Sequence, residues 1–281
     1  MIMRTKEMNH DSETSLSRKT KGHWPTRRFT AHLAVLFLVA ALGTAQASLA
    51  QKQLGNDVFY PTWAAQARYL QTLSVMDTDS ALGRRNLHPK TITLKDMARM
   101  HGHLCDGLVT AWVELNVALR ALFPEGIVDR TDVQAVSKNG PCRVDAGAWM
   151  TGARINQGTL VLDNSVGDGF IVQRISTGEA VRVSMRPGLF PAQLAALEQS
   201  IRARRARGEV VAPTDIDRFE RDANEYSRKL LNTPPDQAVM LEQLTDYHFP
   251  DHSQNPLAPR SDTINRDAPR IIPQPVVNQQ R

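Results

Sequence analysis

Residues 101–107, His-Gly-His-Leu-Cys-Asp-Gly, decide how this sequence is interpreted. They place two imidazoles, a thiol and a carboxylate within seven residues, directly before a helical pattern. Few structural needs explain so dense a cluster. Imidazole nitrogen and thiolate sulfur are ligands preferred by zinc and other borderline metals, and His103 and Cys105 stand two positions apart in one short segment. The segment is therefore the first candidate for a functional site.

Apolar residues at spacings of three and four follow this segment and predict a helix over residues 106–123. Asp106 can cap its first turn, and Pro124 ends it. Cys105 then stands at the start of the helix. The partial positive charge there stabilises a thiolate over a thiol, which favours both metal ligation and nucleophilic reactivity.

A second short helix is expected from Pro141 to about Gly152, because proline suits the first helical turn. Cys142 would lie in its first turn, in the same kind of environment as Cys105. Asp145 falls one turn further on the same face, where it could orient an imidazole or simply complement the helix dipole. In an oxidising compartment the two cysteines could instead form one disulfide, so a metal site and a disulfide both stay open here.

The sequence after Gly152 has the composition of β structure, and helical spacing returns in the last third of the chain. Short runs of branched residues separated by glycine-bearing turns predict an antiparallel meander. The fold class is therefore α+β, with an antiparallel sheet (meander) packed against helices. The expected strands cover 131–136, 159–162, 170–174 and 180–185, and the later helices cover 191–207, 214–231 and 236–244.

Residues 1–50 do not resemble part of this core. A basic stretch ending in Arg27 and Arg28 precedes a short apolar run and small-residue sites, which is typical of a signal peptide, with an uncleaved anchor as the alternative. Export predicts a periplasmic or secreted protein with no stable membrane span after cleavage. The predicted domains are a signal peptide or anchor at 1–50, a loosely attached lead-in at 51–90 with one helix over 63–73, an α+β domain at 91–247 and a disordered tail at 248–281.

Removing the leader changes the charge balance, because it holds seven of the 34 basic and three of the 29 acidic residues. The remaining 27 basic and 26 acidic residues give no reason to expect a nucleic-acid-binding protein. The basic run at 202–207 is interpreted as a solvated helix end. Arg182 alternates with Val181 and Val183, which is typical of a solvent-facing strand residue rather than an anion anchor.

Four ordered blocks resemble the FmdE family, which is named after a component of formylmethanofuran dehydrogenase. The segment 101–107 is similar to its H-G-H-x-C-x-G opening, and NGPCRVDA at 139–146 is similar to its N-x-x-C-x-V-D-A segment. The blocks at 150–160 and 177–183 resemble its T-G…G-K-G-N-L and T-G-x-A-V-R segments. The resemblance extends through the helices to about residue 247.

The resemblance implies an α+β core with trailing helices, usually dimeric, whose His/Cys motifs form a metal-binding or active site. Zinc is the default metal, with another transition metal such as iron or copper as the alternative. The implied metal ligands are His103, Cys105 and Cys142, and the implied catalytic, orienting or proton-handling groups are Cys105, Cys142, His101 and Asp145.

The sequence also departs from the family pattern. Ala153 stands where a cysteine commonly follows the T-G pair, and Asp106 replaces a common proline. No cysteine follows Cys142, so the cysteine-rich zinc module of some members is absent.

Three functions stay open. The first is an exported metal-binding protein, with or without catalysis, whose reaction the sequence does not name. The second is a non-catalytic dimeric thiol/disulfide or sulfur-handling accessory protein, and the third is a disulfide-stapled protein that binds a partner. The sequence does not identify a redox or metalloenzyme partner. The reaction does not transfer with the family, because formylmethanofuran dehydrogenase is a large molybdenum or tungsten complex of several different chains.

Overall fold

The computed structural model divides the chain into two units, Met1–Asn56 and Asp57–Arg281. The first unit, with the predicted signal peptide, and most of the predicted tail lie outside the described residues. Among the helices that the structure describes, none is long and apolar enough to cross a membrane. The described residues are 59–78, 84–250 and 265–270.

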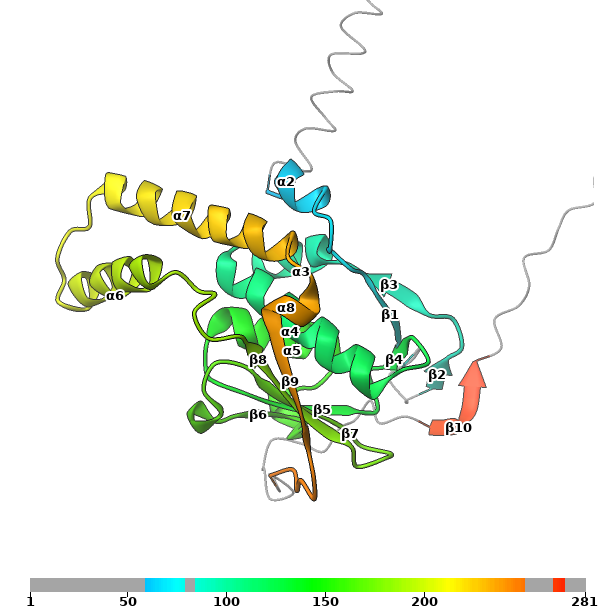
Figure 1. Cartoon of the computed structure of the whole chain (residues 1–281). Coiled ribbons are helices and arrows are strands. Elements are labelled where there is room, and N and C mark those ends of the chain that lie inside the picture. The colour runs from blue at the N-terminus through cyan, green and yellow to red at the C-terminus, as the bar shows by residue number, and fades with distance from the viewer. Residues whose placement is uncertain (1–58, 79–83, 251–264, 271–281) are drawn as a thin grey trace, which may run out of the picture. The chain divides into compact units, whose positions relative to one another are not determined.

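A five-stranded sheet with the strand order β6-β5-β7-β8-β9 forms the centre of the domain (Figure 1). Strands β5, β7, β8 and β9 pair antiparallel, whereas β6 pairs parallel with β5. The mostly antiparallel sheet and its covering helices confirm the predicted α+β class. The strands are β5 (Val133–Ser137), β6 (Leu160–Leu162), β7 (Phe170–Arg174), β8 (Ala180–Met185) and β9 (Val239–Leu244).

The predicted meander is right for β7 and β8 and wrong for β6. Helix α5 (Pro141–Thr151) connects β5 to β6, so the chain crosses over and β6 returns parallel to β5. A crossover of this length permits parallel pairing, which a tight turn does not. Strand β7 therefore pairs with the other edge of β5, where Val136 faces Ile171.

The helix predicted over residues 236–244 is wrong for most of its length. Only Pro235–Ala238 forms a helical turn, α8, and the residues that follow form β9. Strand β9 pairs antiparallel with β8 from Val239 opposite Met185 to Leu244 opposite Ala180. This pairing satisfies the backbone groups at the edge of β8, a requirement that local spacing in the sequence cannot reveal.

Helix α4 (Asp106–Leu122) lies between the sheet and the other helices. It contacts β7, β8 and β9 on one side and α5 and α7 (Pro213–Leu231) on the other, so most of its residues are buried. The prediction of a helix here is confirmed, but Asp106 is its first residue and not its cap. Cys105 occupies the N-cap position, with an extended backbone and no side-chain cap hydrogen bond.

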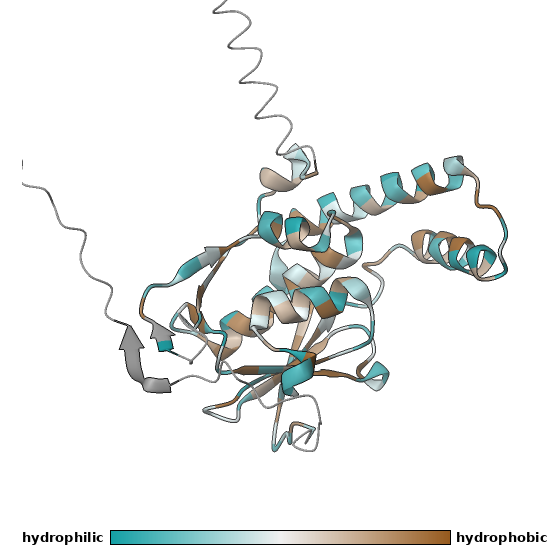
Figure 2. Cartoon of the chain, turned by 180° about the vertical axis from the view of Figure 1, so that it is seen from behind, coloured by the Kyte–Doolittle hydropathy of each residue, from teal (hydrophilic) through white to brown (hydrophobic). Residues whose placement is uncertain are grey.

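Helices α6 (Ala192–Ala206) and α7 confirm the predicted trailing helices. They contact each other, and brown and teal residues alternate along them in Figure 2, as expected of helices with one apolar face. The basic run at the end of α6 is bonded to nearby carboxylates, since Arg202 pairs with Glu198 at 2.5 Å and Arg204 pairs with Asp215 at 2.8 Å. This supports its interpretation as a solvated helix end.

The segment expected as a loosely attached lead-in contributes to the core. Only Thr62–Ala65 is helical, as α2, and Leu73–Met76 is strand β1, with Leu73 and Val75 buried. The one-helix prediction over 63–73 is therefore wrong. Strand β1 is the middle of a second sheet, antiparallel to β3 (Lys90–Ile92) and parallel to β4 (Ile127–Asp129). A two-stranded pair joins β2 (Arg84–Asn86) and β10 (Asn265–Arg270).

Candidate metal centre

The candidate site begins at the end of α3 (Leu94–His101), a helix that the sequence analysis did not predict. Thr93 and Asp96 form a capping box at its start. Gly102 ends it with a positive φ of 100°, a conformation that glycine adopts without strain. His101 is therefore the last residue of a helix and does not lie in a loop. The chain reverses after it and reaches Cys105 at the start of α4.

Helix α5 brings the second cysteine to the same place. Cys142 lies in its first turn, and the two sulfur atoms of Cys142 and Cys105 are 3.3 Å apart. Both cysteines are free thiols. The approach depends on Gly107, because a Cβ atom there would lie 3.0 Å from the Cys142 sulfur. The last glycine of the 101–107 segment is thus required by close packing of α5 on α4.

Three donor atoms form a compact triangle. The Nε2 atom of His101 lies 4.0 Å from the Cys105 sulfur and 3.7 Å from the Cys142 sulfur. Around a tetrahedral zinc ion, bond lengths of about 2.3 Å to sulfur and 2.0 Å to nitrogen place sulfur atoms about 3.8 Å apart and nitrogen about 3.5 Å from sulfur. The observed separations are close to these values, so the three side chains fit a transition metal ion.

Asp145 orients the imidazole of this triangle. The Nδ1–H group of His101 donates to Asp145 Oδ2 at 2.7 Å, which leaves Nε2 free to face the two sulfur atoms. The His101 side chain is nearly buried, whereas Asp145 is partly exposed. A carboxylate bonded to the far nitrogen of a ligating histidine fixes its tautomer and raises its basicity.

His103 occupies the solvent side of the cluster. Its side chain is exposed, and its ring centroid lies 4.8 Å from that of His101. The donor atoms of His101, His103 and Cys105 all lie within 4.8 Å of one another, so these three residues could also hold a metal ion. The sequence analysis placed His103 among the ligands and His101 behind them, but His101 is the histidine that faces both sulfur atoms.

The two thiols share their protons unequally. The pKa of Cys142 is lowered to about 6, because its sulfur accepts a hydrogen bond from the Cys105 thiol and because His101 lies beside it. The pKa of Cys105 is raised, because its thiol donates that bond and is buried. The metal-free pair therefore holds its first negative charge on Cys142.

This asymmetry predicts how the metal-free, reduced protein reacts with iodoacetamide. Only a thiolate is alkylated, so the rate at Cys142 should rise as the pH increases through about 6 and then level off, while Cys105 reacts much more slowly. Mass spectrometry of peptides alkylated between pH 4 and 9 measures both rates. Preferential alkylation of Cys105 would contradict the assignment.

A buried ion pair next to this site escaped the sequence analysis. Glu114 of α4 has no exposed surface and accepts a hydrogen bond from Arg143 Nη1 at 2.7 Å. Arg143 directly follows Cys142 in the chain. The only local sign was a glutamate within the apolar pattern of α4, and its partner 29 residues away could not be identified from spacing.

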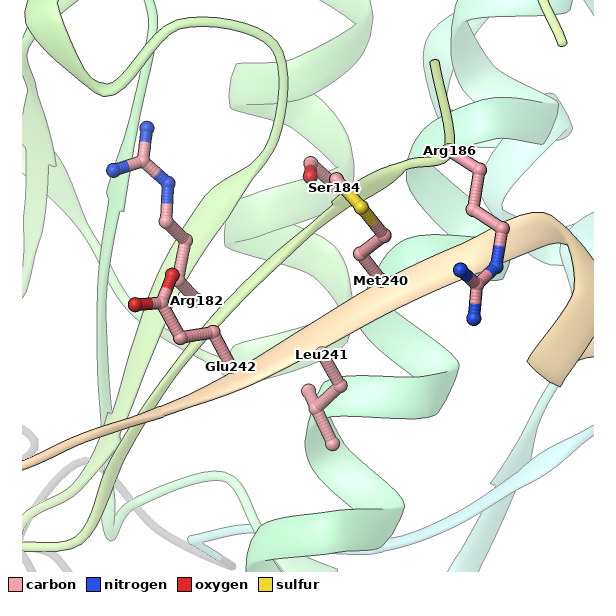
Figure 3. Close-up of a pocket in the computed structure, with 6 residues that line it drawn as sticks. All are labelled: Arg182, Ser184, Arg186, Met240, Leu241 and Glu242. Atoms are coloured by element: carbon pink, nitrogen blue, oxygen red, sulfur yellow. The ribbon is translucent and has the colours of Figure 1, made fainter. Parts of the chain in front are cut away.

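A separate hollow of about 410 Å³ lies where β8 meets β9 (Figure 3). It contains none of the His/Cys donors. As predicted, Arg182 is exposed, while Val181 and Val183 are buried. Its guanidinium donates to the carbonyl of Val166 at 2.6 Å. The hollow is lined by Arg182, Ser184, Arg186, Met240, Leu241 and Glu242.

Comparisons with known proteins agree with the sequence motifs. The family model described as FmdE, Molybdenum formylmethanofuran dehydrogenase operon, matches residues 100–239. A search of curated proteins gave no match. Among solved structures, the chain is similar to an FmdE-like protein of the tungsten formylmethanofuran dehydrogenase type from Syntrophus aciditrophicus. The two share 19% sequence identity over 54% of this chain and 72% of the other, with a TM-score of 0.35. The matched family region contains all five predicted site residues, and the chain is an FmdE-family domain protein.

Proposed function

We propose that this FmdE-family protein is exported and binds one transition metal ion, with zinc as the default, through His101, Cys105 and Cys142. The observation that carries the proposal is the triangle of one nitrogen and two sulfur atoms separated by 3.3, 3.7 and 4.0 Å. His103, on the exposed side, is a candidate fourth ligand. When bound, the ion would act as a Lewis acid toward water or a carbonyl group.

The residues of the chain have distinct roles in this proposal. Cys142 ionises first and supplies the first thiolate, because its pKa is low in the metal-free pair. Asp145 holds the His101 ring so that Nε2 faces the sulfur atoms. Asp145 is also partly exposed, so it can exchange a proton with solvent through the His101 Nδ1 atom.

Elemental analysis tests the proposal on tag-free residues 51–281 purified without chelator. We expect one ion per chain, and cobalt substitution should give the intense near-ultraviolet band of thiolate-to-cobalt charge transfer. Protein that is metal-free as purified and shows no such band when titrated with cobalt would refute the metal site.

The Asp145→Asn variant should weaken metal binding without removing any ligand. An amide cannot accept the Nδ1–H bond with a full negative charge, so the ring loses basicity and a fixed tautomer. Loss of such a partner typically weakens affinity about 10-fold to 100-fold. Competition with a chromophoric chelator measures this change, and the exposed Asp163→Asn exchange serves as a control that should leave affinity unchanged.

A second candidate function is thiol–disulfide exchange. It is favoured by the 3.3 Å separation of the two sulfur atoms and by the lowered pKa of Cys142, which makes that thiol the attacking group. Titration of metal-free protein with glutathione buffers tests it. A Cys105–Cys142 disulfide that forms only under strongly oxidising conditions would count against this function.

Export and self-association form part of the proposal. The support for export is the sequence of residues 1–50, and the support for a homodimer is the resemblance to the family. N-terminal sequencing of protein from a periplasmic or secreted fraction should show a mature start near residue 51. Sedimentation of that protein should show a dimer, and a full-length N-terminus or a monomer would contradict the respective part.

A further inference from the structure

A fully buried carboxylate stands out in the apolar surroundings of α4. Glu114 Oε2 accepts from Arg143 Nη1 at 2.7 Å, and its Oε1 accepts from the backbone N–H of Met185 at 3.0 Å. Burial raises the pKa of Glu114, although Arg143 opposes the shift. Buried ion pairs are weak sources of stability, because apolar replacements of similar size are often as stable. The geometry of this pair therefore suggests a role in positioning.

The pair acts on the same stretch of α5 that carries Cys142. The Cys142 sulfur rests against Gly107 on α4, and the neighbouring Arg143 reaches Glu114 two helical turns further along α4. These two contacts fix both the height of the first turn of α5 and its rotation about the helix axis. The hydrogen bond from Met185 holds the Glu114 carboxylate in place at the end of β8.

We propose that Glu114 and Arg143 are positioning residues that set the separation of the Cys105 and Cys142 sulfur atoms. Their role in metal binding rests on the function proposed above, whereas their effect on the thiol pair does not. Arg143 also lies over the ring of Phe170, with 5.3 Å between its Cζ atom and the ring centroid, so a strand of the central sheet restrains its side chain. The cysteine pair is thereby tied to the core by a charged contact.

A matched control lies at the other end of α5. Arg130 pairs with Asp77 at 2.7 Å and donates to the backbone carbonyl of Trp149. This pair is also mostly buried, with side-chain exposures of 13% and 16% against 11% for Arg143 and 0% for Glu114. It holds the same helix but is not adjacent in sequence to either cysteine. The Asp77→Asn variant therefore reports the effect of breaking an ion pair on α5 without altering the start of the helix.

The experiment compares Glu114→Gln with Asp77→Asn in metal-free protein. In the reaction measured, the two thiols of Cys105 and Cys142 give two electrons and two protons to oxidised glutathione, forming one protein disulfide and two reduced glutathione molecules. We expect Glu114→Gln to lower this equilibrium constant at least about tenfold, because loosely held thiols have a lower effective concentration. Asp77→Asn should change it less than about twofold at a similar loss of melting temperature.

Cobalt binding gives the second readout. Glu114→Gln should weaken cobalt affinity about tenfold or more and shift the visible bands of the bound ion, while Asp77→Asn should preserve both. If wild-type protein binds no metal but the glutathione constant still shifts, the proposed metal function fails and the positioning role stands. A folded Glu114→Gln protein with an unchanged glutathione constant overturns the positioning role.

A double variant covers the case in which Glu114→Gln does not fold. Glu114→Met combined with Arg143→Met replaces the ion pair by apolar groups of similar length, which often preserves stability. A melting temperature near that of wild type with a glutathione constant at least about tenfold lower supports the inference. The same melting temperature with an unchanged constant overturns it.

Discussion

Replacing Cys105 by serine is expected to reduce the metal content of the purified protein from near one equivalent to near zero. A serine hydroxyl does not ionise near neutral pH, so the triangle loses a thiolate that binds soft and borderline metals. His101→Ala should have the same effect, because it removes the nitrogen atom that faces both sulfur atoms. Plasma mass spectrometry of residues 51–281 measures the content directly.

His103→Ala is the informative comparison for this prediction. The His103 side chain is exposed and lies on the outer side of His101, so its loss should weaken binding no more than about tenfold. If His103→Ala empties the site while His101→Ala does not, the ligand order inferred from the sequence is correct and the structural assignment is wrong. If the wild-type protein is metal-free and Cys105→Ser only lowers its melting temperature, the two cysteines serve as a structural staple.

Gly152→Ala is expected to reduce the free energy of unfolding by more than about 4 kcal/mol or to prevent folding. Gly152 caps α5 with a φ of 75°, and a Cβ atom there would lie 2.4 Å from the carbonyl oxygen of Arg130. That distance requires the backbone to move, because neither atom belongs to a flexible side chain. Urea unfolding followed by circular dichroism measures the loss.

Gly178→Ala separates the two causes of this effect. Gly178 has the same φ of 75°, but a Cβ atom there would meet no other atom within 4 Å. Its substitution should cost only the strain of a left-handed alanine, about 1–2 kcal/mol. Equal losses at the two positions would show that the approach of Gly152 to Arg130 is not the constraint.

Local patterns in the sequence predicted those elements whose own residues provide the signal. Strands β7 and β8 have the predicted bounds, 170–174 and 180–185, because branched residues and glycine turns mark both ends. Helices α4 and α5 also begin close to the predicted residues. In these segments the local spacing of apolar residues agrees with the face that is finally buried.

The errors occur where distant partners override local spacing. Residues 239–244 have no fixed preference, and they form a strand because β8 offers an edge to pair with. Strand β6 lies beside β5 because α5 makes a crossover between them. The β1–β4 pair joins segments about 50 residues apart, and no short-range pattern records such a contact.

The sequence by itself determined the donor set of the candidate site, because imidazole, thiol and carboxylate groups in two short motifs suit metal or thiol chemistry wherever they meet. Only the tertiary structure decided how they meet. The end of α3, the start of α4 and the first turn of α5 converge, so that His101 faces both sulfur atoms while Asp145, 44 residues away, holds its ring. His103 is left on the solvent side. The physical reason is that these directions depend on helix packing through Gly107 and the buried Glu114–Arg143 pair, which no local sequence pattern specifies.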